Sequence, residues 1–300
     1  MEENNKFFSE NNIEINNCDC MEYVKKIENE SVSLIITSPP YCMQKAYENL
    51  KDDLETFKKN NREILKEAIR VLKNGGSLCW QVGYHVKDGV VAPLDIIIYN
   101  LIDELNNDLD ESNKMTLRNR IVWTFGHGLH TETRFSGRHE TILWFTKGKN
   151  STFNLDCVRV PQKYPGKTYF KGKKKGLPSG NPNGKNPSDV WDIPNVKSNH
   201  VEKTIHPCQF PIALVQRLIL ALSNEGDVVY DPYLGSGTTA VACYLNNRKF
   251  IGTELIKEYY DVAIVRLNDA FNEKLKMRDD IPVIPPDPNS KVATKPENFK

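Results

Sequence analysis

Apolar and polar positions along this chain alternate between strand-like and helix-like periods. Residues 31–36 (SVSLII) are rich in β-branched side chains and predict a buried strand, whereas residues 56–73 repeat apolar side chains at helical spacing. Residues 77–82 return to a strand-like run after Asn74-Gly75-Gly76, whose glycines predict a left-handed helix end. Strand, helix and strand with short joints predict a crossover unit of a parallel sheet.

The same alternation continues over most of the chain. Helical periods predict turns at 20–27 and helices at 93–104, 211–223, 238–246 and 257–276. Strands are predicted at 12–17, 120–125, 141–146, 227–230 and 249–253, with 120–125 and 141–146 as antiparallel neighbours. We therefore expect an α/β fold with a doubly wound, mostly parallel sheet covered by helices on both faces.

Residues 147–199 interrupt this pattern. They are rich in Gly, Pro, Asn and Lys, and they are too long for an ordinary connecting loop. The pattern thus predicts two halves of one domain at 12–146 and 200–280, with an insertion at 147–199. A tail at 281–300, with five prolines, follows.

Composition narrows the class of protein. The chain has 300 residues, of which 26% are charged, and no apolar run approaches the ~20 residues of a membrane span. The polar N-terminus lacks a secretory pattern, so we expect a cytoplasmic protein that does not engage a membrane. Seven cysteines without a CxxC pair favour neither a disulfide framework nor a zinc cluster, and no metal is expected.

The net charge of +1 is even, but the charges are segregated. Residues 103–111 contain five acidic and no basic residues, whereas residues 159–185 contain eight basic and no acidic ones. In the basic stretch, Tyr164, Tyr169 and Phe170 are interleaved with lysines. Such a stretch is either a solvated loop or a surface that contacts phosphates.

Ile35 to Cys42 reads IITSPPYC, and it ends a strand abruptly. Two prolines forbid a continued strand, so the chain is stiff at Ser38, Pro39, Pro40 and Tyr41. By itself this stretch is either a strand-terminating turn or a rigid support for chemistry.

Val228 to Thr239 reads VVYDPYLGSGTT, a strand followed by a glycine-containing turn and a helix start. Gly235 and Gly237 allow a ligand to approach the backbone closely, and the helix start offers free N–H groups. Neither the dinucleotide fingerprint nor a P-loop is present. Glu254 ends the next predicted strand, where an acidic residue commonly accepts ribose hydroxyls. Together these features favour an adenosine-containing ligand over a plain turn.

TSPPY at 37–41 and DPYLGSGTT at 231–239 together resemble the amino-directed DNA methyltransferases that use S-adenosylmethionine. The catalytic motif comes first here, as in the permuted β group, whose target-recognition region lies between the two motifs. Asn17-Cys18-Asp19 resembles the Gly-Asp element that contacts the cofactor's adenine, with Asn17 in place of glycine. Residues 206–211 (HPCQFP) and Arg138-His139-Glu140 also resemble family segments. The cofactor residues that this resemblance implies are Asp19, Cys20, Thr37, His206, Pro207, Asp231, Pro232, Tyr233, Gly235, Ser236, Gly237, Thr238, Thr239 and Glu254.

The resemblance implies that the Ser38 hydroxyl and the Pro39 carbonyl accept N–H bonds from the target amine. Pro40 stiffens the motif, and Tyr41 offers a ring on which a flipped base stacks. Serine in the first position favours cytosine N4, with adenine N6 as the alternative. RNA or protein glutamine methylation is disfavoured by Ser38, and an inactive DNA-binding module is disfavoured by the intact motifs.

Double-stranded DNA is the partner that the resemblance implies, and the basic stretch lies within the predicted recognition region. The resemblance is also compatible with a cognate restriction enzyme as a partner and with a homodimer. The residues expected to contact DNA phosphates are Lys163, Lys167, Lys171, Lys173, Lys174 and Lys175.

Overall fold

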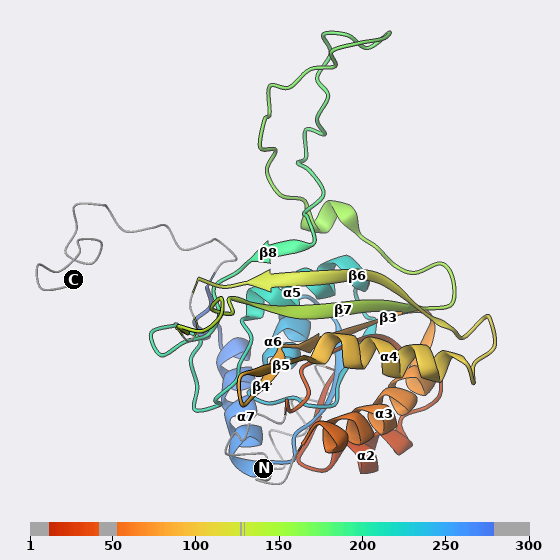
Figure 1. The fold of residues 1–300 in the computed structure, drawn as a ribbon, viewed down its shortest axis with the longest axis vertical. Coiled ribbons are helices and arrows are strands. Elements are labelled where there is room, and N and C mark those ends of the chain that lie inside the picture. The colour runs from red at the N-terminus through yellow and green to blue at the C-terminus, as the bar shows by residue number, and fades with distance from the viewer. Residues whose placement is uncertain (1–11, 42–52, 127, 129, 279–300) are drawn as a thin grey trace, which may run out of the picture.

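The computed structural model describes residues 12–41, 53–126, 128 and 130–278; the predicted tail at 281–300 lies outside them (Figure 1). An eight-stranded sheet has the order β1-β10-β9-β2-β3-β7-β6-β8. Its strands, in that order, are Ile13–Asn16, Lys249–Thr253, Val228–Asp231, Val32–Thr37, Leu72–Val82, His139–Lys147, Met115–Thr124 and Val190–Asp192.

Parallel pairing dominates the sheet, as predicted. Only β7 among these eight strands runs antiparallel to its neighbours β3 and β6, so the predicted antiparallel pairing of 120–125 with 141–146 is confirmed. The central strand β2 lies between β3 and β9, and Leu34 and Ile35 pair with Val229 and Tyr230. Both predicted motifs therefore follow neighbouring parallel strands.

Helices cover both faces of the sheet (Figure 1). The two faces of β2 divide between two apolar clusters: Ile35 joins the cluster of α3 (Leu54–Val71) and α4 (Leu94–Asn106). Leu34 and Ile36 join the cluster of α5 (Ile212–Leu222), α6 (Thr238–Leu245) and α7 (Lys257–Phe271). Burial of each such side chain contributes about 1.5–3 kcal/mol. Because β2 is covered on both faces, its end is held rigidly.

Two predicted helix ends are wrong, and β3 and β6 each begin five residues earlier than predicted. Helix α3 ends at Val71 with Leu72 in an extended conformation, and Asn74-Gly75-Gly76 lie in a bulge within β3, so the predicted glycine cap does not form. Helix α7 ends at Phe271 rather than near 276. There Glu273 adopts a φ of 57°, and Lys274 N donates to Asp269 O at 2.8 Å, which closes the helix with a left-handed turn.

Several elements were not predicted. A hairpin joins β4 (Tyr84–Lys87) to β5 (Val90–Pro93), and β8 arises within the predicted insertion and pairs with β6. The short helix α2 (Cys20–Tyr23) and the 3-10 turn Val24–Lys26 match the predicted turns at 20–27, whereas the 3-10 turn Leu155–Val158 is new. Residues 159–185 project from the body of the protein beyond β8 (Figure 1). All five acidic residues of 103–111 are exposed.

Candidate active site

A single buried carboxylate joins the ends of β2 and β9. Asp231 accepts hydrogen bonds from Thr37 Oγ1 at 2.7 Å, from Thr239 Oγ1 at 2.6 Å and from Tyr233 N at 3.1 Å. Burial raises the pKa of Asp231 to about 6, although the two threonine bonds oppose the rise. The bond to Thr37 spans 194 positions in sequence and fixes the TSPPY motif against the DPYLGSGTT turn.

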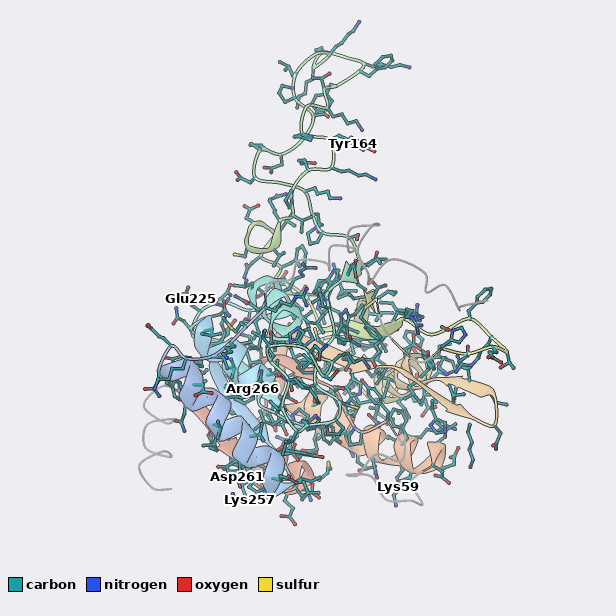
Figure 2. All side chains as sticks on the ribbon, turned by 90° about the vertical axis from the view of Figure 1, so that its left-hand side faces the viewer. Lys59, Tyr164, Glu225, Lys257, Asp261 and Arg266 are labelled. Atoms are coloured by element: carbon teal, nitrogen blue, oxygen red, sulfur yellow. The ribbon has the colours of Figure 1, made fainter. Side chains whose placement is uncertain are left out.

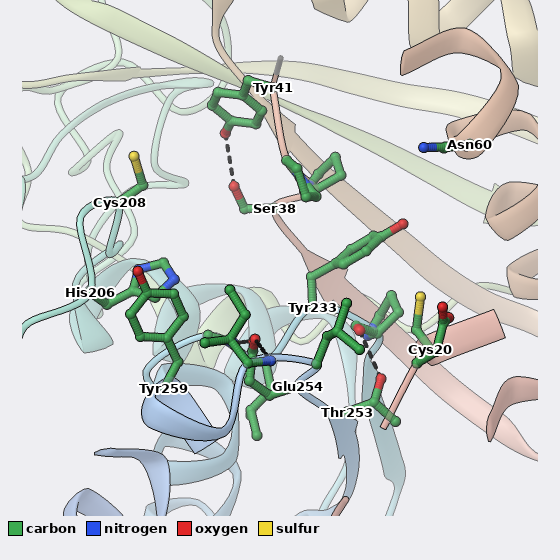
Figure 3. A pocket seen from close by; sticks show the side chains of 18 of the residues that line it. Cys20, Ser38, Tyr41, Asn60, His206, Cys208, Tyr233, Thr253, Glu254 and Tyr259 are labelled. Carbon is green, nitrogen blue, oxygen red and sulfur yellow. Dashed lines mark hydrogen bonds between the residues drawn. The ribbon is translucent and has the colours of Figure 1, made fainter. Parts of the chain in front are cut away.

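These two strand ends open into one cavity of about 460 Å³ (Figure 3). That size lies within the range of pockets that hold small molecules and cofactors. Five of the predicted cofactor residues do not line this cavity. Three of them are buried behind its wall, namely Thr37, Asp231 and Thr239. Gly237 is the N-cap of α6, and Pro207 is exposed outside the cavity. The predicted residues that line it are Ser38, Pro39, Pro40, Tyr41, Asp19, Cys20, His206, Pro232, Tyr233, Gly235, Ser236, Thr238 and Glu254.

The turn after β9 shapes one side of the cavity. Gly235 has a φ of 56°, and a Cβ there would lie 3.2 Å from Nε2 of His206, so a side chain would crowd the turn. Glu254 Oε2 accepts from Gly235 N at 2.9 Å and Oε1 accepts from Ile256 N at 2.8 Å. Burial raises the pKa of Glu254. Each carboxylate oxygen retains a second lone pair, which suits a ligand hydroxyl.

An aromatic pair closes the neighbouring side. The His206 ring packs edge-on against Tyr259, with centroids 4.5 Å apart (Figure 3). Burial lowers the pKa of His206 to about 4, so the ring is neutral near pH 7. A neutral ring adds no positive charge beside a cationic ligand such as a sulfonium.

Asp19 and Asn17 support the floor of the site. Asp19 caps α2 by accepting from Met21 N at 2.7 Å, and Asn17 Nδ2 donates to the carbonyls of Glu254 and Leu255 at 2.8 and 3.1 Å. Asn17 thus links the end of β1 to the end of β10. Glycine, which the family pattern has at this position, could not make this contact.

Residues of the TSPPY motif form the opposite wall of the cavity. Ser38 is partly exposed to the cavity, and Pro39 and Tyr41 are buried. Ser38 Oγ lies 2.8 Å from the Tyr41 hydroxyl (Figure 3). The Tyr41 hydroxyl donates to Gln81 Oε1 at 2.7 Å. The Tyr41 hydroxyl therefore has a structural partner that was not predicted.

Other lining residues were missed by sequence reasoning. Most are ordinary residue types without a motif, and only the fold brings them to the cavity. Cys208, Gln209 and Phe210 lie in the HPCQFP segment, which the family resemblance includes although these three residues were not assigned to the site. The missed lining residues are Cys18, Met21, Thr56, Phe57, Asn60, Asn61, Glu63, Cys208, Gln209, Phe210, Leu234, Thr253, Leu255, Ile256 and Tyr259.

The predicted DNA-contacting lysines lie elsewhere. All six are exposed on the projecting segment 159–185, and none lines the cavity. Figure 2 shows Tyr164 on this segment, far from the body that carries Glu225 and Arg266. The segment is held by bridges of Val160 with Lys185 and Thr168 with Pro178.

The residues that the structure describes contain no group of three or more His, Cys, Asp or Glu side chains that could hold a metal ion. No helix among them is both long enough and apolar enough to cross a membrane. The six cysteines in this part of the chain are unbridged.

A family model described as DNA methylase, for N6 and N4 amino-methyltransferases, matches residues 32–265. The chain belongs to this family. The match spans both motifs, and it supports S-adenosylmethionine as the cofactor.

Curated relatives are similar to most of this chain. The type II methyltransferase M.BglII of Bacillus subtilis is 47% identical over 83% of this chain and 67% of its own length. The DNA adenine methyltransferase YhdJ of Escherichia coli K12 is 35% identical over 84% of this chain and 81% of its own length.

Solved structures confirm the fold. The cytosine-N4-specific PvuII DNA methyltransferase superposes with a TM-score of 0.63 at 21% identity, covering 89% of this chain and 96% of that one. The complex of M1.HpyAVI with S-adenosylmethionine gives a TM-score of 0.56 at 24% identity, covering 85% of this chain and 99% of that one. The doubly wound, methyltransferase-type sheet predicted from the sequence is thus confirmed.

Proposed function

We propose that this protein methylates the exocyclic N4 amine of cytosine in double-stranded DNA, using S-adenosylmethionine. The observation that carries the proposal is the single cavity shared by Ser38, Pro39 and the turn around Gly235. It allows the target amine and the methyl donor to meet in one enclosed space, which favours reaction through proximity.

The residues that line the cavity suit the polar and apolar parts of the cofactor. Glu254 and Asp19 supply carboxylates, and Tyr233 and Leu234 supply apolar surface beside the backbone of Gly235. In our proposal Glu254 accepts ribose hydroxyls and the Gly235 turn receives the amino-acid end. When bound, S-adenosylmethionine supplies an electrophilic methyl group.

The enzyme's own groups activate the amine. An exocyclic amine is a poor nucleophile because its lone pair is delocalised into the ring. Two acceptors for its N–H bonds, the Ser38 hydroxyl and the Pro39 carbonyl, would favour the pyramidal form that localises the lone pair. Rigid acceptors stabilise the transition state most, and the two prolines and the buried strand β2 restrict this motif.

DNA must deliver the base to a site within the protein. We propose that cytosine leaves the duplex and enters the cavity by base flipping, with the Tyr41 ring as a stacking surface. Lysines of the projecting segment would contact the phosphates of the flanking duplex, and 147–199 would act as the target-recognition region. In this proposal the protein works in the cytoplasm, and a restriction partner is suggested by the type II relatives.

Cytosine is favoured by Ser38, the first residue of the SPPY motif. The second candidate is adenine N6, which the relationship to YhdJ favours. Incubation with labelled S-adenosylmethionine and unmethylated DNA, followed by nucleoside analysis, distinguishes them. We expect label in N4-methylcytosine. Label in N6-methyladenine would overturn the base assignment, and unlabelled DNA bases would overturn the enzyme proposal.

Ser38→Ala supplies the test of mechanism. Loss of one transition-state acceptor should slow methyl transfer by about 100-fold while leaving cofactor affinity unchanged. Rates come from single-turnover assays and affinity from calorimetric titration. A full rate in this variant would remove Ser38 from the mechanism.

A further inference from the structure

A chain of side-chain hydrogen bonds extends from Ser38 to a residue outside the cavity. The Ser38 hydroxyl contacts the Tyr41 hydroxyl at 2.8 Å, and Tyr41 donates to Gln81 Oε1 at 2.7 Å. Gln81 Nε2 in turn donates to Glu140 Oε2. Tyr41 and Gln81 are buried, with 7% and 4% exposure, so water competes little for these bonds. This chain of hydrogen bonds thus links the end of β2, the end of β3 and the start of β7.

The direction of this chain follows from the chemistry of its members. A carboxylate only accepts, so the amide nitrogen of Gln81 faces Glu140 and its amide oxygen faces Tyr41. The backbone carbonyl of Gln81, another pure acceptor, lies 3.3 Å from the same Tyr41 hydroxyl. Tyr41 has one hydroxyl proton and gives it toward Gln81. The Tyr41 oxygen is then left to accept, and Ser38 must donate to it.

We propose that Glu140 is a positioning residue that sets the direction of this chain and thereby makes Ser38 an obligate acceptor for the target amine. The inference rests on the proposed function and deepens it. With its proton turned toward Tyr41, Ser38 keeps its lone pairs for the amine's N–H. A freely rotating hydroxyl would instead direct its proton at the amine for part of the time.

The chain orients a proton and does not transport one. The Gln81 amide is a very weak base, so no proton passes through it to Glu140. Hydrogen bonds that share a direction polarise one another, so the negative charge of Glu140 also makes the Ser38 oxygen a better acceptor. A glutamine at this place therefore links an anion to the catalytic hydroxyl while it keeps the anion away from the substrate.

A purely structural role is the rival explanation. Glu140 pairs with Trp123 in the β6–β7 ladder, and its side chain could simply fasten β7 to β3. That role predicts lower stability and weaker cofactor binding in any Glu140 variant. The orienting role predicts a slower methyl-transfer step that depends on the Tyr41 hydroxyl.

Glu140→Gln is the informative change because it keeps the side-chain size. A glutamine at 140 can donate to Gln81 Oε1 and turn the amide round, so that the chain points toward Ser38 and occupies its lone pair. We expect the single-turnover rate to fall about tenfold, with an unchanged dissociation constant for S-adenosylmethionine and an unchanged urea midpoint. Glu225→Gln, on an exposed turn before β9, is the charge-matched control and should behave as wild type.

Tyr41→Phe completes the experiment, because it cuts the chain between Gln81 and Ser38. If Glu140 acts through Tyr41, Glu140→Gln should cause no further loss in the Tyr41→Phe background. Equal losses in both backgrounds, a wild-type rate in Glu140→Gln, or a loss explained by weaker cofactor binding would each overturn the inference. Ser38→Ala separates the two proposals. A full rate in Ser38→Ala overturns both the proposed mechanism and this inference. If Ser38→Ala loses its rate but Glu140→Gln keeps a full rate, only this inference is overturned.

Discussion

Asp231 offers the sharpest test of how the two halves of the site are joined. It is fully buried and accepts from Thr37, Thr239 and Tyr233. We consider Asp231→Asn, which keeps the shape but cannot ionise. The variant loses one acceptor position at every pH, which costs about 1 kcal/mol of unfolding free energy.

The pH dependence isolates the carboxylate itself. Burial raises the pKa of Asp231 from 3.8 to about 6 in the folded protein, so the folded state binds the proton more tightly than the unfolded chain. The associated stability is fully present below the unfolded value and is lost as pH rises through the folded value. The raised pKa contributes about 3 kcal/mol in total to the free energy of unfolding at low pH. About 1.4 kcal/mol of this contribution is lost between about pH 5 and about pH 8.

Urea unfolding of both proteins at these two pH values measures the effect. Asp231→Asn cannot lose this contribution. The difference in free energy of unfolding by which the variant falls below wild type should therefore shrink by about 1.4 kcal/mol at the higher pH. Other titrating groups cancel in the comparison. If this difference in free energy of unfolding stays constant or grows with pH, the pKa of Asp231 is not raised.

Asp227 provides a control of opposite character. Burial alone would raise its pKa, but bonds from Asn224 N, Ser33 and Lys73 outweigh burial and lower it. Asp227 is therefore ionised in both the folded and unfolded states above about pH 5. The cost of Asp227→Asn should be the same at both pH values.

Two further predictions concern the cofactor turn and the projecting segment. Gly237→Ala should destabilise the protein by about 1–3 kcal/mol in urea unfolding, because φ is 80° and the new Cβ would lie 2.8 Å from Ala263 Cβ. Gly226→Ala, with φ of 77° in open space, should cost only about 1 kcal/mol, and equal costs would refute the role of close packing. Replacing Lys173, Lys174 and Lys175 by Gln should weaken DNA binding in a filter assay and flatten its salt dependence. Lys249→Gln, in β10 next to the edge strand β1 on the opposite side of the sheet, should change neither, and unchanged binding in the triple variant would exclude the segment as a DNA contact.

The sheet was predictable because its strands and helices carry strong periodic signals. β2 is buried along its whole length and reads as an apolar run, and α3 presents one apolar face. The antiparallel pair of β6 and β7 was predictable for the same reason. Periodicity does not predict which strands are neighbours, and the pairing of β2 with β9 is known only from the structure.

Other elements escaped prediction for different physical reasons. The β4–β5 hairpin turns at Asp88-Gly89, with φ of 51° and 79°, and Asp-Gly is a recognised hairpin signal that could have identified it. β8 has three residues, too few for a period, and its place beside β6 is set by packing of Trp191. Contacts between distant side chains, such as Gln81 with Glu140, leave no pattern in a single sequence.

The place of β2 at the centre of the sheet has a consequence for the synthesis of the protein. Chains emerge from the ribosome N-terminus first, and β2 can pair with β3 long before β9 exists. Its other edge, apolar on both faces, then remains open to wrong partners until Val228 and the residues after it have been made. A chain that stops short of β9 would carry Ser38 but lack Asp231, so incomplete products would be prone to aggregation and devoid of partial activity.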